Sequence, residues 1–129
     1  MTITHLITDG VYVSAQPKFL AEKSAPEKSV YVYSYEITIK NERKKAIQLK
    51  KRSWTITDAF LNREYVEGDG VIGEYPLINP DETYSYTGYC KLKTNFGTMN
   101  GYYLMLDEDG STIKVLIPDF ILAHPFAIQ

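Results

Sequence analysis

Side chains between residues 31 and 40 alternate in character, and this alternation is the strongest constraint on what the chain can fold into. Large hydrophobic side chains occupy the odd positions, which are Tyr31, Tyr33, Tyr35, Ile37 and Ile39. Polar side chains occupy the even positions from 36 to 40. Successive side chains of a β-strand point to opposite faces of the sheet. A period of two therefore predicts a strand with one buried face.

A second segment changes phase partway along its length. Ile47 and Leu49 share one parity, whereas Trp54 and Ile56 share the other. One face cannot stay buried across such a change unless the strand absorbs an extra residue. We therefore expect a β-bulge, or a crossing between sheets, between Lys50 and Ser53.

Further segments extend the same pattern. Tyr84 and Tyr86 alternate after a turn at 79–81, and residues 11–14 indicate an N-terminal strand. The polar stretch 18–29 is expected to be a connection with a short helical turn. Tyr102, Leu104 and Leu106 alternate in a later strand.

A hairpin is expected at Asp109 and Gly110, because two-residue turns need positive φ and both residues tolerate it. In the return strand we expect Ile113, Val115 and Ile117 to point inward and Thr112 and Lys114 outward. Pro118 should end this strand because proline cannot donate a ladder hydrogen bond. About seven short strands without an amphipathic helix predict one all-β domain over residues 1–129, a sandwich or a barrel.

Charge and cysteine content exclude several classes of protein. The chain has 14 basic and 16 acidic residues, so no field of one sign draws it to nucleic acid or to an anionic membrane. Cys90 is the single cysteine, which excludes an intramolecular disulfide and a cysteine-based zinc site. The first ten residues lack the basic and apolar regions of a signal peptide. A cytoplasmic protein that binds neither membrane nor nucleic acid is expected.

Gly68, Gly70 and Gly73 form a G-x-G-x-x-G motif. In a dinucleotide site these glycines bring the backbone to a pyrophosphate at the start of a helix. Pro76 and Pro80 follow, and they break any helix there. The motif therefore predicts a glycine-rich loop between strands. A nest of backbone amides that holds an anion is the alternative.

Candidate catalytic and metal-binding residues are few. The basic residues at 43–45 and 50–52 are typical of a solvated turn and an outward strand face, and Trp54 beside them is expected in the core. Residues 107–112 lack the glycine that a calcium loop requires at its sixth position. His5 and His124 stand apart, without a third ligand nearby. Cys90 is expected to be a buried hydrophobic residue, so no catalytic residue, metal site or cofactor is predicted.

The eleven tyrosines exceed what one small core needs. Tyrosine combines a large apolar area with a hydroxyl, which suits protein interfaces. We expect Tyr65, Tyr75 and Tyr89 to line a contact surface.

Four motifs together resemble the ApaG (CorD) family over about residues 11–124. They are RSWTITD at 52–58, VEGDGVIGE at 66–74, GTMNGYY at 97–103 and IPDF at 117–120. The resemblance implies an immunoglobulin or fibronectin type III-like β-sandwich from a bacterium, with a link to cobalt and magnesium tolerance. It also implies a protein-interaction role and pyrophosphate binding at Gly68, Gly70 and Gly73, with no catalytic residues to carry over. Many members have histidine where this chain has Ser53, so a metal or proton-transfer role at that position does not carry over.

Three functions are compatible with these residues. The leading hypothesis is a non-enzymatic module that binds a protein partner and through it affects cobalt and magnesium homeostasis. The second is binding of an anion, a pyrophosphate or a nucleotide polyphosphate by the glycine loop with Arg52 and Arg63. The third is direct binding of Mg²⁺ or Co²⁺ by surface carboxylates. Self-association through exposed sheet faces or edges, giving a homodimer, is a further expectation.

Overall fold

The computed structural model describes residues 2–125, which form nine strands and two short 3-10 helices. The strands are β1 (Thr4–Thr8), β2 (Val11–Phe19), β3 (Tyr31–Asn41), β4 (Ile47–Asp58), β5 (Arg63–Asp69), β6 (Leu77–Ile78), β7 (Thr83–Leu92), β8 (Phe96–Asp107) and β9 (Thr112–Ala123). The two helical turns, η1 (Ala21–Lys23) and η2 (Pro26–Lys28), lie in the connection where one turn was expected.

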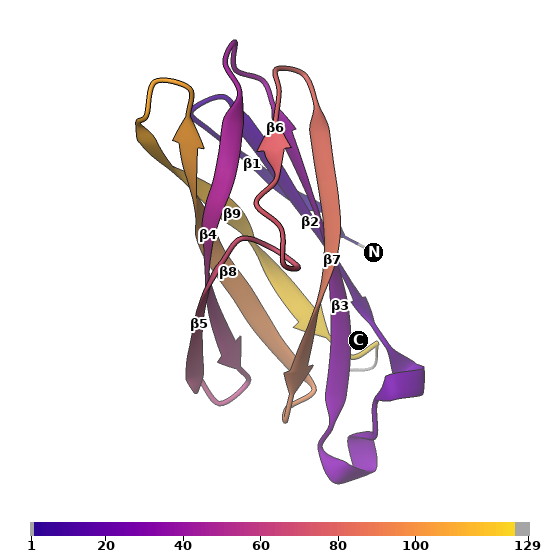
Figure 1. Ribbon diagram of the computed structural model, residues 1–129. Coiled ribbons are helices and arrows are strands. Elements are labelled where there is room, and N and C mark those ends of the chain that lie inside the picture. The colour runs from indigo at the N-terminus through magenta and orange to yellow at the C-terminus, as the bar shows by residue number, and fades with distance from the viewer. Residues whose placement is uncertain (1, 126–129) are drawn as a thin grey trace.

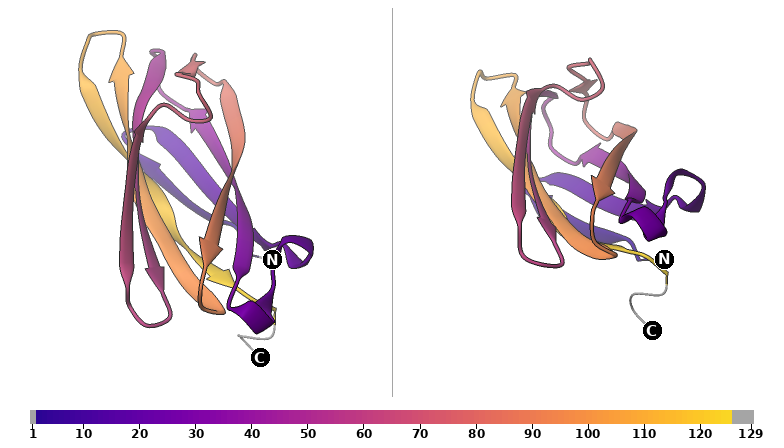
Figure 2. Two further views of the ribbon diagram at one scale, coloured as in Figure 1. Left: turned by 60° about the horizontal axis from the view of Figure 1, so that its bottom comes forward. Right: turned by 90° about the horizontal axis from the view of Figure 1, so that it is seen from below.

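Two antiparallel sheets pack face to face (Figures 1 and 2). One has the order β1-β2-β3-β7, and the other has the order β5-β4-β8-β9 with β6 also paired to β4. This confirms the all-β sandwich of the immunoglobulin or fibronectin type III-like kind. The strand number differs from the expected seven. Neither β1, which is mostly exposed, nor the two-residue β6 carries the alternation that marks a half-buried strand.

The core lies between the sheets where the alternation placed it. Tyr33, Tyr35, Ile37 and Ile39 of β3 are buried. Across the interface Trp54 packs edge-on against Tyr35, with ring centroids 5.2 Å apart. Edge-to-face contacts of this kind are a favoured arrangement of aromatic rings. The central strands of both sheets therefore meet in an aromatic layer.

The change of phase in β4 is a β-bulge at Lys50, as predicted. Leu49 pairs with Met105 and Lys51 pairs with Leu104, so Lys50 is the extra residue opposite β8. Beyond the bulge the even-numbered side chains face the core, beginning with Arg52 and Trp54.

The structure decides which face of β8 is buried and corrects one expectation for β9. Tyr103 and Met105 of β8 are fully buried, so Tyr102, Leu104 and Leu106 lie on the outer face of the sheet. Pro118 does not end β9, which continues to Ala123. The pairing shifts between Met99 and Gly101, and Pro118 lies in β9 opposite this shift, where a missing ladder donor is tolerated. Ile113, Val115 and Ile117 point inward as expected.

The β8–β9 hairpin is present, but its turn differs from the expectation. Gly110 N donates to Asp107 O at 3.0 Å, and Asp107 N donates to Ser111 O at 3.0 Å. The loop therefore has three residues, with positive φ at Gly110 (82°) and not at Asp109. This is the turn in which one left-handed residue follows a type I turn.

Candidate functional site

The glycine motif forms a tight turn and not the start of a helix, as the prolines predicted. Val71 N donates to Glu74 O at 2.9 Å, and Glu74 N donates to Val71 O at 2.9 Å. The two central residues, Ile72 (φ 49°) and Gly73 (φ 73°), are both left-handed. Positive φ at both positions characterises a type I′ turn.

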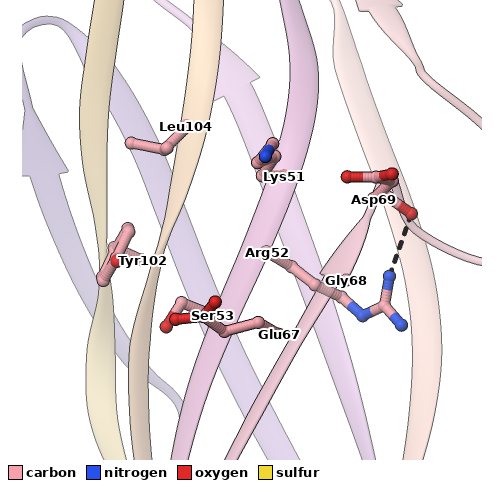
Figure 3. A pocket seen from close by; sticks show the side chains of 8 residues that line it. All are labelled: Lys51, Arg52, Ser53, Glu67, Gly68, Asp69, Tyr102 and Leu104. Atoms are coloured by element: carbon pink, nitrogen blue, oxygen red, sulfur yellow. Dashed lines mark hydrogen bonds between the residues drawn. The ribbon is translucent and has the colours of Figure 1, made fainter.

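Arg52 and the Glu74 carbonyl explain why Gly68 and Gly70, respectively, lack side chains. Arg52 Nη1 donates to Asp69 O at 3.1 Å and to Gly70 O at 2.8 Å, and Figure 3 shows the guanidinium reaching toward Asp69. A Cβ on Gly68 would lie 2.6 Å from the guanidinium carbon of Arg52. A Cβ on Gly70 would lie 2.1 Å from Glu74 O. Both glycines are therefore required by close packing of the loop itself.

A hollow of about 290 Å³ lies beside Gly68 on the outer face of the β5-β4-β8-β9 sheet (Figure 3). Its charged lining residues are Lys51, Arg52, Glu67 and Asp69, while Ser53, Tyr102 and Leu104 complete it. On this face Lys51 meets two carboxylates, while the Arg52 side chain turns to the inner face and donates to the carbonyls of Asp69 and Gly70. An anion would gain little net attraction in this hollow.

Arg63 does not join the glycine loop. It pairs with Thr57 at the start of β5, whereas Gly68 pairs with Arg52 at its other end. Five residues of extended strand separate Arg63 from Gly68, which is about 17 Å. The fold therefore brings Arg52 to the glycines and leaves Arg63 at the opposite end of β5.

The three tyrosines expected at a contact surface are exposed, each on a different element. Tyr65 on β5 is 69% exposed, and Tyr89 on β7 is 63% exposed. Tyr75 is 50% exposed in the connection after the glycine turn, with Lys50 Nζ 5.6 Å from its ring centroid. Tyr89 has Lys23 Nζ at 5.5 Å.

Residues 70–78, here called the glycine connection, present an apolar surface that the sequence analysis missed. Ile72 is 65% exposed and Leu77 is 60% exposed, on either side of Tyr75. Val71 and Ile78 point the other way into the core. In Figure 1 the connection runs across the gap between β5 and β7. The sequence predicted a loop here with Tyr75 exposed, but nothing in its pattern distinguished the exposed Ile72 and Leu77 from their buried neighbours.

The glycine connection is held in place by hydrogen bonds along its length. Gly70 N donates to Lys50 O at 2.8 Å, and Leu49 N donates to Pro76 O at 3.0 Å. Gln48 Nε2 donates to Tyr75 O at 3.1 Å. All three tie the connection to β4, so its exposed side chains sit on a fixed backbone.

A second hollow of about 580 Å³, here called the β1 groove, was also missed. It lies between β1 and the outer face of the β4, β8 and β9 strands. The lining residues from three of the four family motifs meet here, and they are Ser53, Thr55, Asn100, Gly101, Tyr102, Ile117, Pro118 and Asp119. The irregular pairing of β8 with β9 lies in its floor. Bulges are over-represented beside functional sites.

Among residues 2–125, the buried tyrosines and Cys90 offer no base or nucleophile at neutral pH. Burial raises the pKa of Tyr35 to about 12 and the pKa of the Cys90 thiol to about 11. Burial also raises the pKa of Tyr103 well above its ordinary value. The Tyr86 and Tyr103 hydroxyls share a short hydrogen bond inside the core. These groups stay protonated, and a protonated thiol is a poor nucleophile.

The basic turn at 43–45 meets the acidic hairpin at 107–109. Arg43 Nη2 lies 3.6 Å from Asp107 Oδ2, and Lys45 Nζ pairs with Asp109 Oδ2. Trp54 is buried in the core. Arg43 and Lys45 are therefore paired with carboxylates, and the Trp54 ring is not exposed for stacking on a nucleic-acid base.

Within residues 2–125, no group of three or more histidine, cysteine, aspartate or glutamate side chains is placed to hold a metal ion. The same part of the chain contains no helix of the length and apolar character needed to cross a membrane.

Comparisons with known proteins place these features in a family. The ApaG domain family matches residues 21–107. The chain is 44% identical over 119 residues to Protein ApaG of Afipia carboxidovorans, covering 92% of each chain. It shares 44% identity over 123 residues, or 95% of each chain, with Protein ApaG of Sinorhizobium fredii. A crystal structure described as an ApaA protein from Bordetella pertussis superposes with a TM-score of 0.88 at 39% identity, over 90% of this chain and 94% of that one.

Proposed function

The chain belongs to the ApaG domain family, and from that premise we propose that it is a non-enzymatic module that binds a protein partner through the glycine connection. Its effect on cobalt and magnesium homeostasis is then indirect and passes through that partner. A single buried cysteine that stays protonated suits a reducing compartment, so we place the protein in the cytoplasm.

One observation carries this proposal, namely the conformation of Ile72. A β-branched residue with positive φ is a genuine outlier, because its Cβ is crowded by the neighbouring backbone. Glycine or asparagine fits this position of a type I′ turn better. Ile72 is 65% exposed, so its side chain is not explained by core packing. Strained residues of this kind cluster at functional sites, which supports a role in contact.

The surroundings of Ile72 support the same conclusion. Tyr75 and Leu77 add two exposed hydrophobic side chains to the same connection. Because the backbone is tied to β4, little conformational entropy is lost when a partner binds, which favours affinity. An apolar centre within a polar surface is the usual composition of a binding site on a protein.

The test uses Ile72→Asn, which keeps the turn and removes the hydrophobic side chain. Tagged wild-type and variant chains are purified from the native host, and proteins that co-purify are identified and their affinities measured. We expect a partner whose affinity falls at least about tenfold in the variant. Ile121→Asn is the matched control, since Ile121 is 62% exposed on β9. Equal affinities for all three chains would refute the proposal.

The alternative, anion binding at the glycine loop, is tested by titrating the chain with pyrophosphate and following backbone amide shifts. Shifts at residues 68–73 at submillimolar ligand would favour it over the interaction module. Calorimetry with Mg²⁺ and Co²⁺ tests the third function, direct ion binding, in the same way.

A further inference from the structure

The β4–β5 hairpin carries the two most exposed large hydrophobic side chains of the described chain. Phe60 is 79% exposed and Leu61 is 78% exposed, side by side in the 58–62 turn, here called the hairpin tip. The tip lies at the far end of β5 from the glycine connection (Figure 1). Seven residues of strand separate the two, which is about 23 Å.

The 107–111 turn provides an internal reference for this tip, because its hydrogen bonds are the same. Leu61 N donates to Asp58 O at 3.1 Å, as Gly110 N donates to Asp107 O at 3.0 Å. Asp58 N donates to Asn62 O, as Asp107 N donates to Ser111 O, both at 3.0 Å. The left-handed position is Gly110 in one turn (φ 82°) and Leu61 in the other (φ 67°).

The aspartate at the start of each turn plays the same role in both. Asp58 Oδ1 accepts hydrogen bonds from Phe60 N and Asn62 N, each at 2.9 Å. Asp107 Oδ1 accepts from Asp109 N at 2.9 Å and Ser111 N at 3.1 Å. Position by position, Phe60 therefore corresponds to Asp109 and Leu61 to Gly110. The fold requires an aspartate and a left-handed residue in this turn, and it requires no hydrophobic side chain.

Neighbouring contacts hold the tip rigidly. Ala59 N donates to Thr94 Oγ1 at 3.1 Å, and Thr94 Oγ1 donates to Phe96 O at 2.8 Å. Thr94 is buried, so the base of the tip is fixed to the β7–β8 turn. Asn62 Nδ2 also donates to Asp58 Oδ2 at 3.1 Å. A preorganised pair of hydrophobic side chains is what a binding anchor requires.

We propose that the hairpin tip is a second binding surface, whose Phe60 and Leu61 side chains insert into an apolar pocket of a folded protein partner. Phe60 and Leu61 are 79% and 78% exposed at the turn of a hairpin, so a partner surface must be concave to enclose both side chains. Its rim is polar and charged, with Asp58, Asn62 and Arg63 around the two hydrophobic side chains. A hydrophobic centre with a polar rim is typical of a protein interface.

A lipid bilayer fits these residues less well. Two side chains provide at most the marginal, reversible membrane affinity of a single acyl chain. The Asp58 carboxylate would enter the bilayer with them, and burying a charge there is costly. The net charge of −2 gives no attraction to anionic lipids. A protein pocket can instead leave Asp58 at its hydrated rim.

The experiment places a photoreactive phenylalanine analogue at position 60 or, as the matched control, at position 109 of the full chain in the native host. We expect a discrete adduct with another protein from position 60 and none from position 109. Adding Leu61→Gly should reduce the yield at least about tenfold without lowering Tm, because glycine suits the left-handed position. Equal yields from the two positions, or no adduct from position 60, would overturn the proposal.

A second measurement tests whether the Phe60 side chain contributes to the affinity for the captured protein. The captured protein, once purified, should bind the wild-type chain and bind Phe60→Ser at least about tenfold more weakly. Unchanged affinity would refute the proposal. Two further results would overturn the proposal. One is Phe60-dependent flotation of the chain with vesicles of phosphatidylcholine and phosphatidylglycerol, and the other is a Phe60-dependent dimer in sedimentation. Ile72→Asn should leave the position 60 adduct unchanged, which separates this surface from the glycine connection.

Discussion

The guanidinium of Arg52 lies directly over Gly68 on the neighbouring strand, where a β-carbon would come within 2.6 Å of its central carbon. From this position Arg52 donates to the carbonyl of Asp69 and to that of Gly70, the first residue of the glycine connection. The glycine and the arginine therefore act as a unit that fixes the start of the connection.

Replacing Gly68 with alanine should displace Arg52 and break these hydrogen bonds. We expect the free energy of unfolding to fall by about 1–3 kcal/mol, measured by urea denaturation. In an Arg52→Met background the same replacement should be less costly, since the displaced group is gone. Equal losses in both backgrounds would contradict the coupling between the two residues.

Gly101→Ala should be far more damaging than Gly110→Ala. A β-carbon on Gly101 would lie 1.9 Å from Ser53 O, and neither backbone can move without breaking the sheet beneath the β1 groove. We expect a loss of about 3 kcal/mol or more. Gly110 has open space around it, so an alanine there would clash with no neighbouring atom. The cost is only that of holding alanine in the left-handed conformation, about 1–2 kcal/mol in the free energy of unfolding. Thermal unfolding of both variants checks the order.

Ile72→Asn should stabilise the chain while removing a hydrophobic side chain. Asparagine tolerates positive φ, so relief of the strain at Ile72 is expected to add about 1 kcal/mol, a Tm increase of about 4 °C. Ile121→Asn, at a similarly exposed strand position, should give no such increase. A lower Tm for Ile72→Asn would show that Ile72 serves the fold.

Alkaline pH should destabilise the protein through Tyr35 and Cys90, whose folded pKa values are about 12 and about 11. Their ordinary values are lower, so above about pH 9 the unfolded chain loses protons that the folded chain keeps. The free energy of unfolding therefore keeps its full value below about pH 8.5 and declines as the pH rises toward 12. Denaturation series between pH 7 and 11.5 check this. Absorbance near 295 nm should show the buried tyrosines ionising together with unfolding. A profile that stays flat to pH 11 would contradict the assignment.

The alternation of hydrophobic and polar side chains predicted the buried face of a strand correctly where every second side chain was polar. In β3 the pattern was unambiguous, and the change of phase in β4 located the bulge at Lys50. In β8 both parities are hydrophobic, because Tyr102 and Leu104 cover the outer face while Tyr103 and Met105 fill the core. A period of two then does not tell which face of the strand is buried.

The candidate surfaces were harder to predict, because they depend on residues in conformations that their types disfavour. Positive φ is expected at glycine and asparagine, so nothing in the sequence marked Ile72 or Leu61 as left-handed. Arg52 does lie against the glycines with which it was grouped, in a packing contact and two backbone hydrogen bonds. Arg63, eleven residues further along, was grouped with them although the antiparallel strands carry it to the opposite end of β5.

The bulge in β4 also determines which changes in length the strand can accept. Lys50 is the surplus residue, so a chain lacking it could close into a regular strand with Trp54 still facing Tyr35 and Ser53 still on the outer face of the sheet. Loss of any residue from Arg52 onward would instead move every later side chain of the strand to the opposite face of the sheet. Among homologous chains, single-residue gaps in this strand should therefore fall at the bulge.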